Sequence, residues 1–123
     1  GTLTARAFIV RAYARRALAE LFEPVDVLAW PSVAAPAPPL SDPRVELPSG
    51  PTSADASNAR QGVIANLTGI PAISVPVGLV EGMPVGFQLL GPWASDALLL
   101  DAAEALERAT DRQFVELRPA AVA

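Results

Sequence analysis

The chain has 123 residues, of which 51% are hydrophobic, and its formal net charge is −4. This composition is too apolar for a disordered chain, and the negative charge disfavours direct binding to nucleic-acid phosphates. No apolar run approaches the ~20 residues that a membrane-spanning helix needs, and the first residues lack the pattern of a secretory signal. We therefore expect a folded chain that contacts neither nucleic acid nor membrane.

Cysteine, histidine and lysine are absent, and all nine basic residues are arginine. Their absence removes disulfides, thiolate nucleophiles, zinc sites with nitrogen or sulfur ligands, and histidine-assisted catalysis. We expect no metal site. Because a cysteine-free chain suits a reducing compartment, the cytoplasm is the expected location.

Residues 4–22 are expected to form a helix that ends at Pro24. Apolar residues at three- and four-residue spacing predict one buried stripe, made of Val10, Tyr13, Ala14, Ala17, Leu18 and Leu21. Four arginines lie mostly off that stripe, namely Arg6, Arg11, Arg15 and Arg16. We interpret them as a solvated helix face, with a docking patch for a partner as the alternative.

Residues 26–30, DVLAW, are a short apolar run between prolines and predict a buried strand. From Pro31 to Pro51 the chain has seven prolines in 21 residues, a density that neither a helix nor a sheet interior accepts. Residues 31–53 are therefore expected to form a proline-rich, extended loop of polyproline character.

Residues 54–67 are expected to form a helix, with Ser57 as the candidate N-cap and Gly69 just past its end. Residues 72–77 and 85–90 alternate between apolar and other residues. Each segment predicts a strand, and the turn-forming residues between them predict an antiparallel hairpin.

Pro76 cannot donate to a strand ladder, so we expect an edge, a bulge or a strand end at this position. Residues 96–109 predict a further helix, with Ser95 as its N-cap. Its buried stripe is expected to consist of Leu99, Ala103 and Leu106. The tail from Pro119 is expected to be loose.

The run NLTGIPAISVPVG at residues 66–78 begins a specific pattern of spaced glycines and prolines. The pattern comprises Asn66, Gly69, Pro71, Ala72, Ser74, Pro76 and Gly78, followed by Gly82, Pro84, Gly86, Gln88 and Gly91. In this register the chain resembles the C-terminal part of the amidase signature family. That family includes bacterial amidases, fatty-acid amide hydrolases and the A subunit of the tRNA-dependent amidotransferase. Upstream, DVLAWP resembles one of the family's strands.

This resemblance implies an α/β fold, in which the chain supplies about three strands and three helices of an α/β/α sandwich around a mixed sheet. Residues 1–123 would be the C-terminal segment of an amidase domain, not a complete catalytic domain. In such a segment Gly69 and Gly78 would permit backbone turns, and the prolines would fix the direction of the chain.

The family hydrolyses amide C–N bonds with a serine nucleophile, a second serine and a lysine, without metal or cofactor. Those residues lie N-terminal to the part that this chain resembles. The chain has no lysine, and its nearest serine-rich stretch, PSGPTSADAS at 48–57, resembles a polar turn before a helix. No catalytic residue is therefore predicted here, and the chain alone is expected to be inactive.

The resemblance also implies a substrate-pocket wall formed by Ala59, Gly62 and Val63, to which Trp30 and Ser32 could be added. The A subunits of amidotransferases carry an aspartate at the position of Ala59, where it holds the amino group of the substrate. The small, apolar wall in this chain favours an uncharged acyl or aryl group instead. The alternative is that these residues are ordinary core, and that Gln88 hydrogen-bonds to backbone rather than substrate.

Two other functions remain open at this point: a segment of the A subunit of an amidotransferase, and a non-catalytic interaction module. For the complete amidase the substrate would be a small-molecule amide. A partial sheet leaves apolar faces exposed, so we expect self-association or docking to the N-terminal part of an amidase domain.

Overall fold

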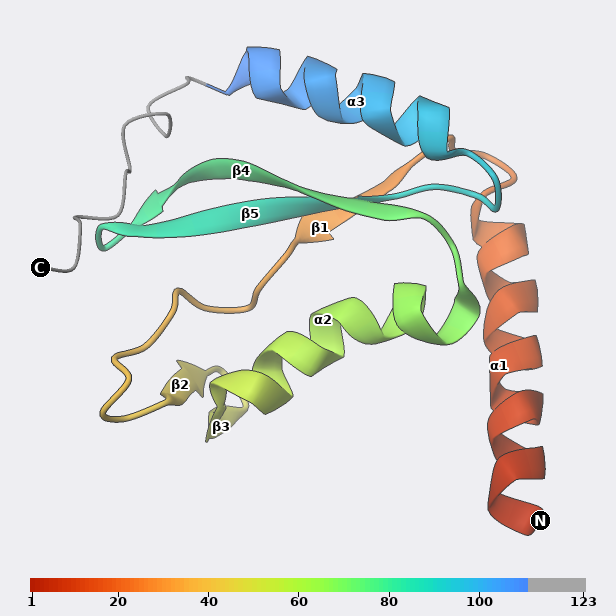
Figure 1. Ribbon diagram of the computed structural model, residues 1–123, viewed down its shortest axis with the longest axis horizontal. Helices are drawn as coiled ribbons and strands as arrows, with labels where there is room; N and C mark the ends of the chain where they lie inside the picture. Colours follow the sequence, from red (N-terminus) through yellow and green to blue (C-terminus); the bar gives the residue numbers. More distant parts are fainter. Residues whose placement is uncertain (111–123) are drawn as a thin grey trace, which may run out of the picture.

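The computed structural model describes residues 1–110 and has three layers, with a sheet between α3 on one face and α2 on the other (Figure 1). The elements are α1 (Thr2–Leu21), β1 (Leu28–Pro31), β2 (Arg44–Leu47), β3 (Gly50–Ser53), α2 (Ala54–Thr68), β4 (Ala72–Val80), β5 (Met83–Leu90) and α3 (Asp96–Ala109). The expected α/β class, with three helices and a three-stranded sheet, is confirmed. The expected loose tail from Pro119 lies outside the described residues.

The three-stranded sheet has the order β1-β5-β4, and both of its pairings are antiparallel. A mixed sheet therefore stays a prediction for a complete domain, because residues 1–110 form no parallel pair in this sheet. β1 is an edge strand whose residues alternate between half-buried and exposed. The strand expected at 26–30 is present but begins two residues later than predicted, and the expectation that it is buried was wrong.

The predicted hairpin is formed by β4 and β5, which are longer than expected and meet at the two-residue turn Glu81–Gly82. Both turn residues have positive φ, 52° and 79°, as tight hairpin turns of the primed type require. Gly78 does not make a turn, contrary to expectation, because it pairs with Val85 inside the ladder. The register shifts between Pro76 and Gly78 on the edge strand β4, which confirms the bulge expected near this proline.

Helix α3 covers one face of the sheet with the stripe that its sequence predicts. Leu99 and Ala103 are buried against Val75 and Leu89, and Leu106 packs at the margin of this cluster. Ser95 occupies the N-cap position, but its hydroxyl donates to the carbonyl of Pro92 at 2.7 Å rather than accepting from the helix. The apolar stripe, and not a side-chain cap, therefore holds α3 in place.

The proline-rich segment 31–53 is not a continuous loop, because β2 and β3 form a second antiparallel hairpin within it. Proline removes one backbone donor, which an edge strand tolerates, and Pro51 lies in β3 opposite Glu46. At the start of this hairpin the guanidinium of Arg44 donates to Asp42 from Nε at 2.7 Å and from Nη2 at 2.9 Å. This hydrogen-bonded pair lowers the pKa of the Asp42 carboxyl below its ordinary value.

Because of the second hairpin, the N-cap of α2 is Ser53 and not Ser57, which the sequence analysis predicted. Because β3 ends at Ser53, the helix begins at the next residue, and the Ser53 hydroxyl accepts from the amide of Ala56 at 3.2 Å. Ser57 is instead buried within the first turns, with 2% of its surface exposed. Gly69 ends the helix as predicted, with φ 72° and its amide donating to the carbonyl of Ala65 at 2.8 Å.

Helix α1 stands at one end of the sheet, and most of its predicted apolar stripe is not buried by residues 1–110 (Figure 1). Leu18 is buried with Ile70 and Leu90 in a second core cluster. Val10 and Tyr13 are 57% and 78% exposed. The 3.6-residue period correctly predicted a helix, but the period alone does not say which element covers its apolar side.

Candidate functional site

Two serines and a glycine meet on the sheet face opposite α3. The Ser32 amide donates to the carbonyl of Gly86 at 2.9 Å, and the hydroxyls of Ser32 and Ser74 share a hydrogen bond. A Cβ on Gly86 would lie 2.7 Å from Ser74 Oγ and 2.9 Å from Ser32 Oγ. The Ser32–Ser74 pair therefore requires glycine at position 86.

Replacing Gly86 by alanine is expected to lower the free energy of unfolding by about 1–3 kcal/mol, because the new methyl group separates the Ser32–Ser74 pair. The control is Gly62→Ala in α2, where a Cβ meets only the end of the Asn66 side chain at 3.8 Å. A helix favours alanine over glycine, so the control should be neutral or stabilising. Urea unfolding of both variants makes the comparison, and a Gly86 variant as stable as the control would contradict this account.

Neither a histidine nor a lysine of this chain lies beside the Ser32–Ser74 pair. Serine becomes a nucleophile when a histidine, lysine or equivalent group accepts its proton. The 123 residues contain neither histidine nor lysine. We interpret the pair as a structural contact.

Gln88 lies in the same row, opposite Trp30 on β1 and opposite Ser74 on β4. Its Nε2 is buried and has no hydrogen-bond partner among residues 1–110. The backbone hydrogen bond expected for this side chain is therefore not made by Nε2 in the described part of the chain. A buried amide donor of this kind is unfavourable unless an acceptor reaches it.

Trp30 and Ser32, the first two predicted wall residues, lie at the end of β1. Trp30 packs against the cluster of Leu18, Ile70 and Leu90. It therefore contributes to the second core cluster, as the alternative interpretation expected. Ser32 is held by its contacts with Gly86 and Ser74, as described above.

The other three predicted wall residues lie together on α2. Ala59 and Val63 are exposed, Gly62 is half-buried, and their spacing places them on one side of the helix with Asn66. Ile64 lies on the opposite side, where it packs against the Leu90 cluster. The structure thus brings Ala59, Gly62 and Val63 onto one exposed helix face, separate from the sheet row.

One cluster was missed by the sequence analysis. Arg15 Nη1 donates to the carbonyl of Thr68 at 2.8 Å, and the indole of Trp93 donates to the same carbonyl at 3.3 Å. The Arg15 guanidinium lies 4.4 Å from the centre of the Trp93 ring, a cation–π distance. The interpretation of the arginines as a solvated face is wrong for Arg15, and also for Arg11, whose Nε is buried.

Arg15 therefore fastens α1 to the end of α2 and to the β5–α3 loop. Arg16, by contrast, is exposed and pairs with Glu20 one turn away at 3.1 Å. The sequence analysis placed the four arginines mostly off the apolar stripe and gave no separate signal for Arg15. Its partner lies 53 residues away in the sequence.

Comparison with known proteins decides the family. The profile of the Amidase family matches residues 2–100. The chain belongs to the amidase family. Among its relatives, the A subunit of the glutamyl-tRNA(Gln) amidotransferase from Thermus thermophilus is 44% identical over 109 residues. A fatty acid amide hydrolase of Medicago truncatula is 44% identical over 93 residues.

Solved structures of the amidase family have the same fold over this segment. A crystal structure of an amidase matches with a TM-score of 0.78 at 34% identity, covering 82% of this chain and 23% of that one. The A subunit of the glutamyl-tRNA(Gln) amidotransferase from Thermotoga maritima matches with a TM-score of 0.71 at 27% identity, covering 87% and 22%. The match with the Thermus protein covers 86% of this chain and 22% of the relative. The amidase-family chain thus spans about a fifth of the length of the relatives that it matches.

Two further observations concern the described part of this amidase-family chain. No helix within residues 1–110 is long and apolar enough to cross a membrane. Over the same residues, no three acidic, cysteine or histidine side chains are grouped so that they could hold a metal ion.

Proposed function

We propose that this chain is the C-terminal segment of a serine-dependent amidase, in which it forms scaffold and one wall of the substrate pocket. Membership of the amidase family, over only about a fifth of the relatives' length, is the observation that carries the proposal. The motif from Asn66 to Gly91 supports the assignment to this segment of the domain. The lack of lysine supports it as well, because the catalytic lysine of such an amidase would have to lie in another part of the domain. The segment by itself is catalytically silent.

The outward face of α2 is the proposed wall. Ala59 and Val63 are exposed there, and neither they nor Gly62 carries a charge or a hydrogen-bonding side chain. Such a surface suits an uncharged acyl or aryl group, because burying an unpaired ammonium against it would be unfavourable. Trp30 and Ser32 stay proposed as wall residues on the sheet, separate from this helix face. An acceptor from the rest of the domain would complete the hydrogen bond of Gln88.

The A subunit of an amidotransferase is the second candidate, because a protein of that name is 44% identical to this chain. The apolar residue Ala59 counts against a substrate with a free amino group. A non-catalytic interaction module is the remaining alternative. The cytoplasm stays the proposed compartment.

Amide hydrolysis tests the proposal directly. The purified 123-residue chain is expected to hydrolyse neither aryl nor aliphatic amides above the uncatalysed rate, because no base can activate its serines. A longer polypeptide that includes the region encoded upstream is expected to hydrolyse uncharged amides. Turnover by the 123-residue chain would contradict the proposal, and activity of the longer protein with glutamine alone would favour the amidotransferase.

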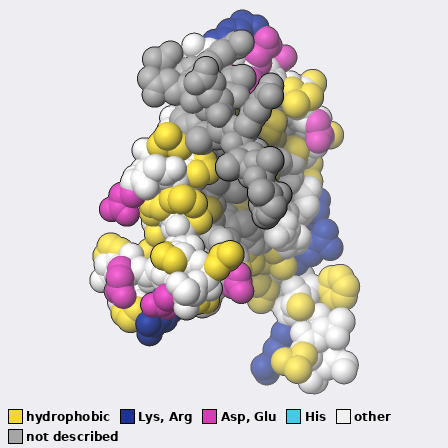
Figure 2. All heavy atoms as spheres, turned by 60° about the vertical axis from the view of Figure 1, so that its left-hand side comes forward, with side chains coloured by type: hydrophobic (Ala, Val, Ile, Leu, Met, Phe, Trp, Pro, Cys, Tyr) yellow, Lys and Arg dark blue, Asp and Glu magenta, His cyan; other side chains and the backbone are white. Residues whose placement is uncertain are grey.

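Contact with the rest of the domain, or with a second copy, is proposed for α1. Phe8, Ile9, Val10 and Tyr13 are between 57% and 78% exposed. Figure 2 shows hydrophobic side chains on the protruding helix at the lower right. A patch of this kind usually marks an interaction surface.

Light scattering of the isolated chain is therefore expected to show dimers or larger species at high concentration. The double variant Phe8→Gln, Ile9→Gln should shift the distribution towards monomer, because it removes apolar surface from α1. Arg16→Gln, on the same helix, serves as the control and should leave the distribution unchanged. A clean monomer of the unmodified chain at high concentration would contradict the expectation.

A further inference from the structure

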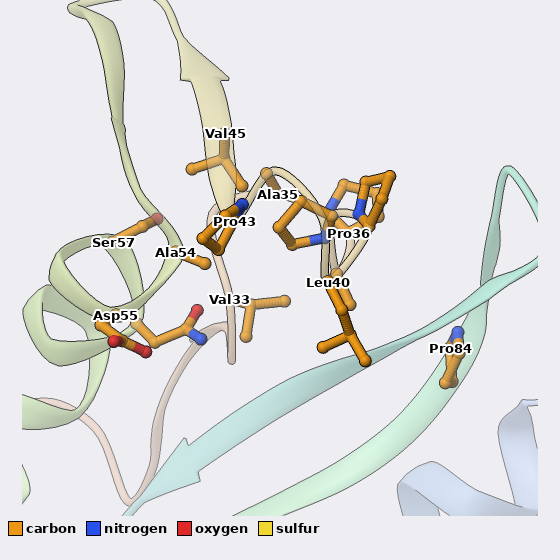
Figure 3. A pocket seen from close by; sticks show the side chains of 14 residues that line it. Val33, Ala35, Pro36, Leu40, Pro43, Val45, Ala54, Asp55, Ser57 and Pro84 are labelled. Atoms are coloured by element: carbon orange, nitrogen blue, oxygen red, sulfur yellow. The ribbon is translucent and has the colours of Figure 1, made fainter.

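A pocket of about 320 Å³ lies between the 33–43 loop, β2, the first turns of α2 and Pro84 of β5 (Figure 3). Its lining is Ala, Val, Leu and Pro, except at the start of α2, where Asp55, Ser57 and Asn58 contribute polar groups. The volume is at the small end of the range of about 300–1,000 Å³ for small-molecule sites. An apolar pocket with a few polar groups at one side is typical of such sites.

Ser57 supplies the first sign that this pocket takes a ligand. The residue is almost completely buried, since only 2% of its surface is exposed, and Oγ has no hydrogen-bond partner among the described residues. Figure 3 shows its oxygen directed from α2 towards the side of the pocket formed by Pro43 and Val45. A buried hydroxyl without a partner is unfavourable, so a group that enters the pocket and hydrogen-bonds to it gains affinity.

The rim and walls supply a second sign. Leu40 lines the pocket but is fully exposed to solvent, so its apolar side chain is available to cover a ligand. Prolines at 36, 38, 39, 43 and 84 form much of the wall. Because proline restricts the backbone, this wall is largely preformed, and a ligand loses little affinity to ordering the loop.

This pocket is distinct from the proposed substrate wall. Ser57 and Ala59 are two residues apart in α2, which places them about 200° apart around the helix axis. Ser57 points inward towards the loop, whereas Ala59 is on the exposed face. None of the five predicted wall residues lines the pocket.

We propose that this pocket binds a small uncharged molecule with an aromatic or branched aliphatic body and one hydroxyl or amide group, which hydrogen-bonds to Ser57 Oγ. Asp55 is the only ionisable residue in the lining. Its carboxylate repels anions, so carboxylic acids of the same size bind more weakly. The site does not depend on the proposed function, because it lies on the other side of α2.

Titration of the isotope-labelled 123-residue chain with benzyl alcohol, followed by NMR, tests the proposal. Saturable shifts of backbone amides are expected within residues 33–45 and 54–58, and benzoate should bind more weakly than benzyl alcohol. Ser57→Ala should lower the affinity for benzyl alcohol by roughly 2- to 10-fold, which corresponds to the loss of one ordinary hydrogen bond. Ala56→Ser, at an exposed position of α2 that does not line the pocket, is the matched control and should bind benzyl alcohol like the unmodified chain.

Two further variants separate the parts of the proposal. Val33→Phe should fill the pocket and abolish the saturable shifts, and Asp55→Asn should reduce the preference for the alcohol over benzoate. Far-UV circular dichroism confirms that each variant is folded. Equal affinity of Ser57→Ala and the unmodified chain, or shifts that do not saturate or lie elsewhere, would overturn the proposal.

Discussion

Leu90→Ala is expected to lower the free energy of unfolding by about 2–5 kcal/mol, the range for removing a fully buried leucine. Leu90 has no exposed surface and is packed with Leu18 and Ile70. It also lies opposite Leu28 on β1 and Ala72 on β4. The cavity left by alanine would therefore weaken both the attachment of α1 and the end of the sheet at which β5 meets β1 and β4.

Urea unfolding followed by circular dichroism measures the effect. The matched control is Leu100→Ala in α3, where the side chain is 62% exposed, and its effect should be within about 0.5 kcal/mol. If both variants lost the same stability, Leu90 would not be the centre of the second core cluster.

Arg15→Met is expected to release α1 from the rest of the fold and to reduce stability by about 1.5–3 kcal/mol, the range for a hydrogen bond to a charged group. Methionine keeps much of the apolar stem but removes the bond to the Thr68 carbonyl and the contact with Trp93. Leu18 is the only residue of α1 that is buried in the described structure. The guanidinium is therefore a large part of what fixes this helix.

Hydrogen exchange of α1 amides, together with urea unfolding, tests this expectation. The control is Arg16→Met, which removes only an exposed pair with Glu20, a contact usually worth about 0–1 kcal/mol. Faster exchange in α1 should occur with Arg15→Met and not with Arg16→Met. Equal protection in the two variants would show that Arg15 does not hold the helix.

Elements with a strong local period were predicted correctly from the sequence. Helix α3 and the β4–β5 hairpin were predicted because their apolar residues repeat at 3.6 and 2 residues, and both bury the side that repeats. The end of α2 at Gly69 was predicted because glycine readily adopts the left-handed conformation found there. In each case the signal lies within a few residues of the feature.

Features that depend on distant residues were not predicted. The β2–β3 hairpin was missed because the many prolines of residues 31–53 predicted a loop, and composition does not show which prolines lie on an edge strand. Because β3 of that hairpin ends at Ser53, the N-cap of α2 is Ser53 and not Ser57. The apolar residues of α1 have the period of a buried face, but the described part of the chain does not cover them.

For the candidate site, too, residues were singled out in the sequence, but their contacts with one another were not predicted. Ser32, Ser74 and Gly86 were all singled out in the sequence, but their contact depends on how β1, β4 and β5 pair, and the two serines are 42 positions apart. The role of Arg15 depends likewise on Thr68, far along the chain. Pairwise contacts over such distances are set by packing, which leaves no periodic trace in the sequence.

Labelling with a serine-reactive fluorophosphonate, read by intact-protein mass spectrometry, most directly tests whether amide-bond chemistry is absent from this segment. We expect the folded 123-residue chain to remain unmodified under conditions in which a complete amidase is labelled once per molecule. One label per chain on Ser32, Ser74 or any other serine, lost on unfolding, would contradict the account.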